Sequence, residues 1–172
     1  MQKSSIYAIV TILVVFSVVG VFLYEYTPVD EVRTDIESGD VIEYTYTEYD
    51  DGPKPSWTHR MEVLNYNEDG TLAVANKVID TIYPTAMTTD GFIAKMVPDI
   101  QSEDAEYLCD EKIDTPFGKR TCQVYMHDGD GYTLKVWVGV DSGIVYHTQE
   151  HRDGLGPDQY MDCWLTECTL FM

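Results

Sequence analysis

The stretch from Tyr132 to Val140, YTLKVWVGV, decides the fold class of this chain. Its apolar side chains recur at every second position, which is the period of a β-strand with one buried face. Turn signatures border it on both sides, Asp128-Gly129-Asp130-Gly131 before it and Asp141-Ser142-Gly143 after it. The apolar face must pack against another element, so the stretch predicts a strand within a hairpin-rich β domain.

The same alternation recurs over most of the chain from Val41 onward, where Ile42, Tyr44 and Tyr46 alternate with polar residues. Pro84 to Asp99 breaks the pattern, and Asp90 followed by GFIAKMV predicts one short helix from Asp90 to Val97, with Asp90 as its N-cap. We therefore expect a mainly β domain, an antiparallel barrel or half-barrel of about eight strands with one short helix. The expected strands cover residues 41–47, 57–63, 72–82, 106–114, 119–127, 132–140, 143–146 and 160–171.

A hydrophobic run at residues 6–24, IYAIVTILVVFSVVGVFLY, precedes this domain. No charged residue lies between Lys3 and Glu25, and about 20 apolar residues are enough for a helix to cross a bilayer. Lys3 precedes the run and acidic residues follow it, so the positive-inside rule predicts a cytoplasmic N-terminus and an extracytoplasmic C-terminal domain. A cleaved signal peptide is the alternative.

The chain is thus expected to divide into four parts. They are a cytoplasmic stub at residues 1–5, a transmembrane signal anchor at 6–24, an acidic tether at 25–40 and an extracytoplasmic β domain at 41–172.

The charge balance is strongly acidic, with 30 Asp and Glu against 11 Lys and Arg and a formal net charge of -19. Such a field repels phosphate backbones, which argues against nucleic acid as a partner. An acidic surface of this kind also occurs in proteins that must stay soluble in high salt.

All four cysteines, Cys109, Cys122, Cys163 and Cys168, lie in the expected extracytoplasmic domain. An even count in an oxidising compartment predicts two disulfides. A turn at residues 115–118 lies near the midpoint between Cys109 and Cys122, so a simple hairpin would place these two nearly opposite each other. We expect a Cys109–Cys122 bridge, whereas Cys163 and Cys168 need a turn or a bulge to pair. A four-thiolate zinc site is the alternative, but paired C-x2-C motifs are absent.

The segment from His147 to His151, HTQEH, matches the H-x-x-E-H signature of inverted zinc peptidases. That chemistry requires both histidines on one helix, one turn apart. The preceding residues 143–146 predict a strand, on which residues four apart are separated by about 13 Å. We therefore interpret the two histidines as solvent-facing residues at a strand end, and we expect no catalytic residue, metal site or cofactor. Simple hairpins on both sides of residues 132–140 would make Trp137 face both Cys122 and His147.

Aromatic and aliphatic side chains on the expected strands could line a binding pocket. The candidate ligand-facing residues are Tyr44, Tyr46, Trp57, Leu134, Val136 and Val138.

The run from Asp114 to Tyr146 contains TPFGKRTC, a glycine turn and an aromatic strand that ends in V-x-V-D-x-G. It resembles small archaeal and bacterial membrane-anchored surface proteins with lipoprotein-carrier-like β half-barrels of the LolA and LppX type. The resemblance implies a curved sheet, covered by helices, that encloses an apolar cavity for acyl chains.

These features favour a membrane-anchored extracytoplasmic binding or interaction module, which holds an apolar or lipid-like ligand or a partner protein of the cell envelope. The alternative is a structural or accessory subunit of a membrane or envelope complex with no small ligand. A zinc-dependent hydrolase that acts through residues 147–151 is the third interpretation.

Overall fold

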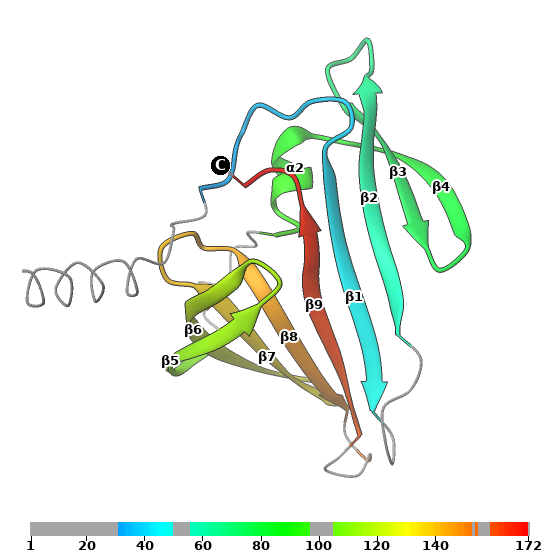
Figure 1. Cartoon of the computed structure of the whole chain (residues 1–172). Helices are drawn as coiled ribbons and strands as arrows, with labels where there is room; N and C mark the ends of the chain where they lie inside the picture. Colours follow the sequence, from blue (N-terminus) through cyan, green and yellow to red (C-terminus); the bar gives the residue numbers. More distant parts are fainter. Residues whose placement is uncertain (1–30, 50–55, 97–104, 153, 155–158, 172) are drawn as a thin grey trace, which may run out of the picture.

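A computed structural model describes residues 31–49, 56–96, 105–152, 154 and 159–171. These residues form one sheet of nine antiparallel strands and one short helix, α2 at Thr89–Ile93 (Figure 1). The strands are β1 Val41–Tyr49, β2 Trp57–Tyr66, β3 Leu72–Val78, β4 Thr81–Met87, β5 Ala105–Thr115, β6 Gly118–Gly129, β7 Tyr132–Gly139, β8 Val145–Arg152 and β9 Tyr160–Cys168.

The strand order is β4-β3-β2-β1-β9-β8-β7-β6-β5. Strands that are consecutive in sequence pair within two meanders, β1–β4 and β5–β9, whereas β4 and β5 do not pair with each other. The pairing of β1 with β9 joins the two meanders. The prediction of a mainly β antiparallel domain with one short helix is therefore confirmed. The sheet is open, because β4 and β5 form its two edges, and the closed-barrel alternative is wrong.

The strand that the sequence pattern did not separate is β4. Its Pro84 lies opposite Ala75 of β3, at the edge of the sheet. Proline has no N–H to donate to a ladder, which excludes it from central strands but not from an edge strand, where one side needs no partner. Pro84 was therefore a sign of an edge strand and not of the end of the sheet.

The short helix α2 covers one face of the sheet. Its N-cap is Thr88, whose hydroxyl accepts a hydrogen bond from Gly91 N, and Asp90 lies in the first turn instead of capping it. Phe92 and Met96 are fully buried against the sheet. Val145 N donates to Met96 O at 2.7 Å, so the residues after the helix are tied directly to β8.

Residues 31–40 pack against the domain instead of extending from it as a tether. Val32 forms a β-bridge with Phe171, and Ile36 is buried in the core. Asp40 is also buried, and its carboxylate accepts hydrogen bonds from Arg33 Nη2 at 2.5 Å and from Thr169 Oγ1 at 3.0 Å. This part of the expected tether belongs to the folded domain.

The expected anchor at residues 6–24, the stub before it and residues 25–30 lie outside the described residues. Within the part of the chain that the structure describes, no helix is long and apolar enough to cross a membrane.

The two predicted disulfides are not formed, since all four cysteines are free. In the β5–β6 hairpin, Thr115 pairs with Gly118, and this register places Glu111 opposite Cys122 and Val124 opposite Cys109. Proline at the second position and glycine at the fourth position of a four-residue turn are the preferences of a type I turn. The turn is therefore centred one residue later than the midpoint between the two cysteines, so Cys109 and Cys122 are diagonal instead of opposite.

Cys163 and Cys168 both lie on the helix-bearing side of β9, because a register shift between Glu43 and Tyr44 of β1 changes the alternation. Cys163 pairs with Tyr46 and Cys168 with Ile42. These partners are four residues apart on β1, which corresponds to about 13 Å and is too far for a disulfide. The bulge expected for a Cys163–Cys168 pair is therefore present, but the two thiols are too far apart to form a disulfide.

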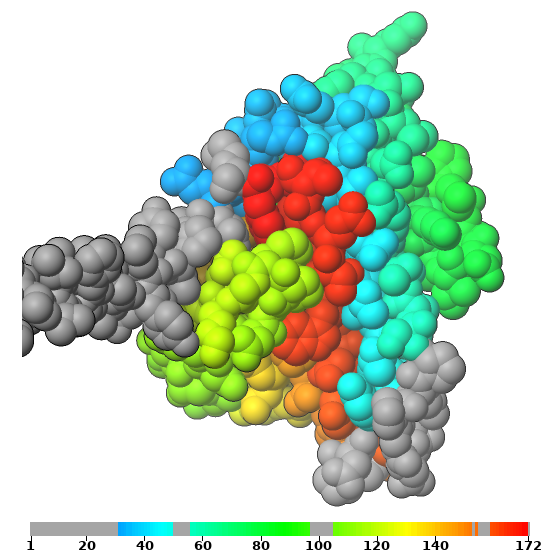
Figure 2. Space-filling model, in the orientation of Figure 1, coloured from blue at the N-terminus to red at the C-terminus, as the bar shows by residue number. Residues whose placement is uncertain are grey.

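The tip of the β5–β6 hairpin packs against the end of the chain. The Phe117 ring lies edge-on to Phe171 with ring centroids 4.7 Å apart, and Tyr146 tilts against both rings. Figure 2 shows the yellow-green hairpin beside the red C-terminal residues. This cluster joins the turn between β5 and β6 to β8 and to the residues that follow β9.

The cysteine geometry predicts four free thiols. Without reductant, the unfolded full chain should react with four equivalents of a thiol reagent, and its intact mass should show no loss of hydrogens. In the folded protein, the exposed Cys109 should react first, and the buried Cys122 and Cys163 should be protected. A mass lower by two hydrogens would reveal a bridge and contradict this register.

The turn between β3 and β4 predicts a stabilising substitution. Ile79 has φ of 54°, in the left-handed region that is unfavourable for a β-branched residue. Its side chain is 59% exposed, so burial does not offset the backbone strain. Ile79→Asn should raise the free energy of unfolding by about 1 kcal/mol in urea titrations. Ile82→Asn, at an exposed position of the same hairpin, is the control, and an equal gain there would exclude relief of backbone strain as the cause.

Candidate functional site

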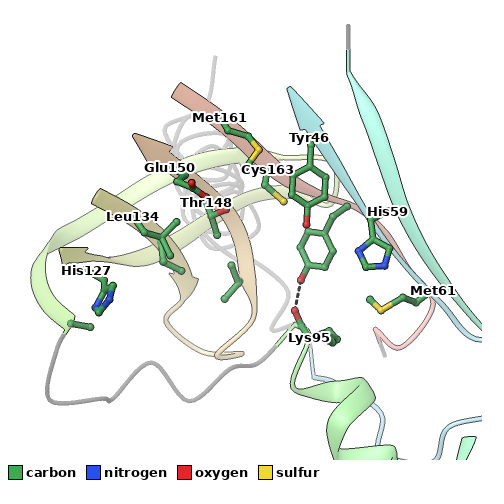
Figure 3. Close-up of a pocket in the computed structure, with 14 residues that line it drawn as sticks. Tyr46, His59, Met61, Lys95, His127, Leu134, Thr148, Glu150, Met161 and Cys163 are labelled. Atoms are coloured by element: carbon green, nitrogen blue, oxygen red, sulfur yellow. Dashed lines mark hydrogen bonds between the residues drawn. The ribbon is translucent and has the colours of Figure 1, made fainter. Parts of the chain in front are cut away.

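The helix-bearing face of the sheet carries a cavity of about 540 Å³ (Figure 3). Its floor is a row of side chains that lie opposite one another on four adjacent strands. Tyr46 of β1 pairs with Cys163 of β9, Cys163 with Thr148 of β8, and Thr148 with Val136 of β7. Opposed residues of antiparallel strands point to the same side of a sheet, so the whole row faces the cavity.

The cavity is mostly apolar, and its volume lies within the roughly 300–1,000 Å³ that is usual for small-molecule sites. Its apolar lining consists of Tyr44, Tyr46, Met61, Ala105, Leu134, Val136, Val145, Met161 and Cys163. Its polar lining consists of His59, Lys95, His127, Thr148 and Glu150. Both meanders of the sheet contribute, and Figure 3 shows His127 and Leu134 on one side of the cavity and His59 and Met61 on the other.

Four of the six candidate ligand-facing residues line this cavity: Tyr44, Tyr46, Leu134 and Val136. Trp57 does not line it but stacks on Tyr46, with ring centroids 5.7 Å apart and an angle of 6° between the rings. Val138 pairs with Val145 and also lies outside the lining.

Sequence reasoning missed the other ten lining residues, among them Met161 and Cys163 of β9. The cysteine was assigned to a disulfide, and the strand was treated only as the last one. The available signal was the alternation of Met161, Cys163 and Leu165, which places one face of β9 beside the aromatic face of β1.

Two tyrosines and a cysteine lie together at the base of the cavity. Tyr44 Oη donates to Lys95 O at 3.0 Å, which links β1 to the segment after α2 (Figure 3). Tyr46 and Cys163 lie opposite each other on β1 and β9, so the thiol lies beside the Tyr46 side chain. Burial raises the pKa of both tyrosines and raises the pKa of Cys163 to about 11. The Cys163 thiol therefore stays protonated at neutral pH and behaves as a weakly polar part of the wall.

On the opposite face, His147 is buried between two tryptophans. Its ring lies 4.2 Å from Trp137 and 3.9 Å from Trp164, and its Nε2 is 2.9 Å from Asp162 Oδ1. The interpretation of His147 as solvent-facing is wrong, because its position in β8 places it between β7 and β9 rather than at an edge. Trp137 does face His147, but its other neighbour is Val124 and not Cys122.

The HTQEH segment is part of a strand. His147 and His151 both lie in β8, where residues four apart are separated by about 13 Å. His127 lines the cavity on the other face, away from His147. Among the described residues, no three His, Cys, Asp or Glu side chains are close enough to hold a metal ion together.

The buried thiols predict a loss of stability at high pH. Burial raises the pKa of Cys122 to about 12 and of Cys163 to about 11, from an ordinary value of 9.0. Between pH 9 and 11 the unfolded chain loses these two protons while the folded chain keeps them. The free energy of unfolding should therefore fall by about 1.4 kcal/mol per pH unit for each thiol.

Urea titrations across this pH range measure the effect. Cys163→Ala should remove about half of the slope that the two thiols produce, whereas Cys109→Ala, at an exposed position, should leave the slope unchanged. A stability that is constant up to pH 11 would contradict the burial of these groups.

No protein-family model matches this chain, and no curated protein matches it in sequence. Among solved structures, it is similar to MucB in complex with MucA(peri), with 13% identity and a TM-score of 0.43 over 74% of this chain and 49% of that chain. It is also similar to the MucA/MucB complex of Pseudomonas aeruginosa, with 12% identity and a TM-score of 0.42 over 74% of this chain and 50% of that chain. This chain spans about half the length of those structures, and at these values the similarity assigns it neither a family nor a partner.

Proposed function

We propose that this protein is a membrane-anchored extracytoplasmic binding module that holds an apolar ligand in the cavity on the helix-bearing face. The observation that carries the proposal is the cavity itself. A sheet face covered by a helix ordinarily buries its apolar side chains against that helix at close packing. Here Phe92 of α2 and Met96 after it cover only one end of the face, and a cavity of about 540 Å³ lies beside them among the described residues.

The lining supports an apolar ligand with limited polarity. The walls consist mainly of aliphatic and methionine side chains, which are Met61, Leu134, Val136, Val145 and Met161. Methionine side chains adapt to ligands of irregular shape. The hydroxyl of Tyr44 already has a partner within the protein, and most of the lining is apolar, so a ligand gains most by burying hydrocarbon. Polar groups on the walls belong to His59, His127 and Glu150.

The membrane anchor and the compartment are supported by residues 6–24 and by the charges on their two flanks. The cysteines no longer contribute to this part of the proposal, because they are free. The packed segment at residues 31–40 leaves only a few residues between the hydrophobic run and the domain, which supports a position of the cavity close to the bilayer surface.

We propose no catalytic step. The buried thiol of Cys163 is protonated at neutral pH, and the histidines that line the cavity, His59 and His127, lie on opposite walls (Figure 3). A binding role uses the apolar walls directly and requires no activated nucleophile.

Filling the cavity tests the proposal. Leu134→Trp adds a large ring to the wall at a partly buried position, and Leu64→Trp makes the same change at an exposed position of β2 that does not line the cavity. The measurement is fluorescence titration of the full chain, in nanodiscs, with the neutral apolar probe N-phenyl-1-naphthylamine. Loss of the cavity should weaken the saturable binding of the probe by about tenfold or more in Leu134→Trp, which corresponds to at least about 1.4 kcal/mol.

Leu64→Trp should bind the probe as the unchanged protein does, after subtraction of the signal from empty nanodiscs. Equal binding by all three proteins, or no saturable binding above that background, would sink the proposal. Thermal melting of the same samples establishes that Leu134→Trp is folded.

A further inference from the structure

The face of the sheet opposite the apolar cavity carries a second hollow, of about 350 Å³. Five polar side chains line it: Thr133 and Lys135 of β7, Gln149 and His151 of β8, and Tyr160 of β9. The register explains why they meet. Thr133, His151 and Tyr160 lie opposite one another in one row, and Lys135 and Gln149 form the next row with Asp162 of β9.

The alternation of the strands separates this groove from the apolar cavity. On β7, Leu134 points into the cavity while Thr133 and Lys135, on either side of it, line the groove. On β8, Thr148 and Glu150 line the cavity while Gln149 and His151 line the groove. The two sites therefore lie back to back, with the same three strands between them.

The polar groups of the groove are oriented by neighbours. His151 Nδ1 is 2.9 Å from Gln159 O, and since a carbonyl can only accept, Nδ1 carries a hydrogen and Nε2 accepts in the neutral ring. Gln149 Nε2 donates to Asp162 Oδ1 at 3.3 Å, which leaves the amide oxygen as an acceptor. Thr133 Oγ1 donates to Asp128 Oδ1 at 3.0 Å, so its hydroxyl oxygen also serves as an acceptor.

Aromatic rings border the groove on two sides. Tyr160 stacks on Tyr49, with ring centroids 4.6 Å apart and 19° between the rings. In the register, the row after Lys135, Gln149 and Asp162 is the stack of Trp137, His147 and Trp164, in which Trp137 and His147 are buried. Tyrosine offers an apolar ring and a polar hydroxyl together, which suits a ligand with a hydrocarbon face and hydroxyl edges.

Charge narrows the class of ligand. Lys135 lines the groove, with its Nζ 5.9 Å from the centre of the Trp137 ring, and it disfavours a cation. The carboxylates of Asp128 and Asp162 accept hydrogen bonds from the lining residues Thr133 and Gln149, and the chain carries a net charge of -19, which disfavours an anion. A neutral ligand with many hydroxyl groups meets neither penalty and matches the mixture of donors and acceptors.

We propose that this groove binds a neutral saccharide unit. The groove is large enough for a small-molecule ligand, has donors and acceptors at fixed positions and is bordered by aromatic rings. The proposal goes beyond the apolar ligand of the other face and does not depend on it. It makes the protein a two-sided module, with one face for hydrocarbon and the other for sugar.

The test is an NMR titration of the full chain, in phosphocholine micelles, with methyl β-D-glucoside, methyl α-D-mannoside and N-acetyl-D-glucosamine. Glucuronate serves as the anionic comparison. At least one neutral sugar should shift the amide signals of Lys135, Gln149 and His151, with a dissociation constant on the order of 1 mM, and should bind more tightly than glucuronate.

Gln149→Leu keeps the volume of the side chain and removes its polar atoms, so it should weaken sugar binding by about fivefold. Gln123→Leu on β6 is the matched control, because Gln123 also makes one side-chain hydrogen bond, to Tyr125, but lies outside the groove. Both variants should bind N-phenyl-1-naphthylamine as before, and Leu134→Trp should still bind the sugar, which separates the two proposals.

Three results would overturn the assignment. The first is that no neutral sugar shifts the amide signals of the groove residues. The second is that glucuronate binds more tightly than every neutral sugar. The third is that Gln149→Leu and Gln123→Leu bind the sugar with equal affinity.

Discussion

The pairing of β1 with β9 is the interaction on which the rest of the structure depends. Every other pair of neighbouring strands is joined by a hairpin or a short connection, so each meander can form from local contacts. Among neighbouring strands, β1 and β9 are the pair that brings together residues more than a hundred positions apart, as in the hydrogen bond between Thr45 and Thr166. This pairing turns two small sheets into one, and it places Tyr44 and Tyr46 beside Leu165 and Cys163.

Both candidate sites follow from that joined sheet and from the alternation of side chains along its strands. The apolar cavity needs Met61 and His59 from the first meander and Leu134 and Val136 from the second. The polar groove needs β7, β8 and β9 in register, with Tyr49 of β1 stacked against Tyr160. The stack of Trp137, His147 and Trp164 lies on the opposite face from the adjacent row of Val136, Thr148 and Cys163, so both faces of the shared strands carry packed side chains.

Where the structure differs from the strands and side-chain faces predicted from the sequence, the cause is an edge or a bulge of the sheet. Pro84 is acceptable in β4 because that strand has a partner on one side only. The shifts near Tyr107 and Glu43 add one residue to a strand, and each changes which face the following side chains meet. One such shift brings Cys168 to the same face as Cys163, where its thiol contacts Met96 and not a second cysteine.

The sequence by itself determined the mainly β class, most of the strands, the short helix and the residues that share a face, because these depend on a period of two and on turn residues close together in the chain. Periodicity alone therefore assigned Tyr44, Tyr46, Leu134 and Val136 to apolar faces, and all four line the cavity. The tertiary structure alone decided that β1 meets β9, that the sheet stays open, that the four thiols remain apart and that His147 is buried. Strand partners distant in sequence and single-residue bulges depend on how whole faces pack, which no local periodicity encodes.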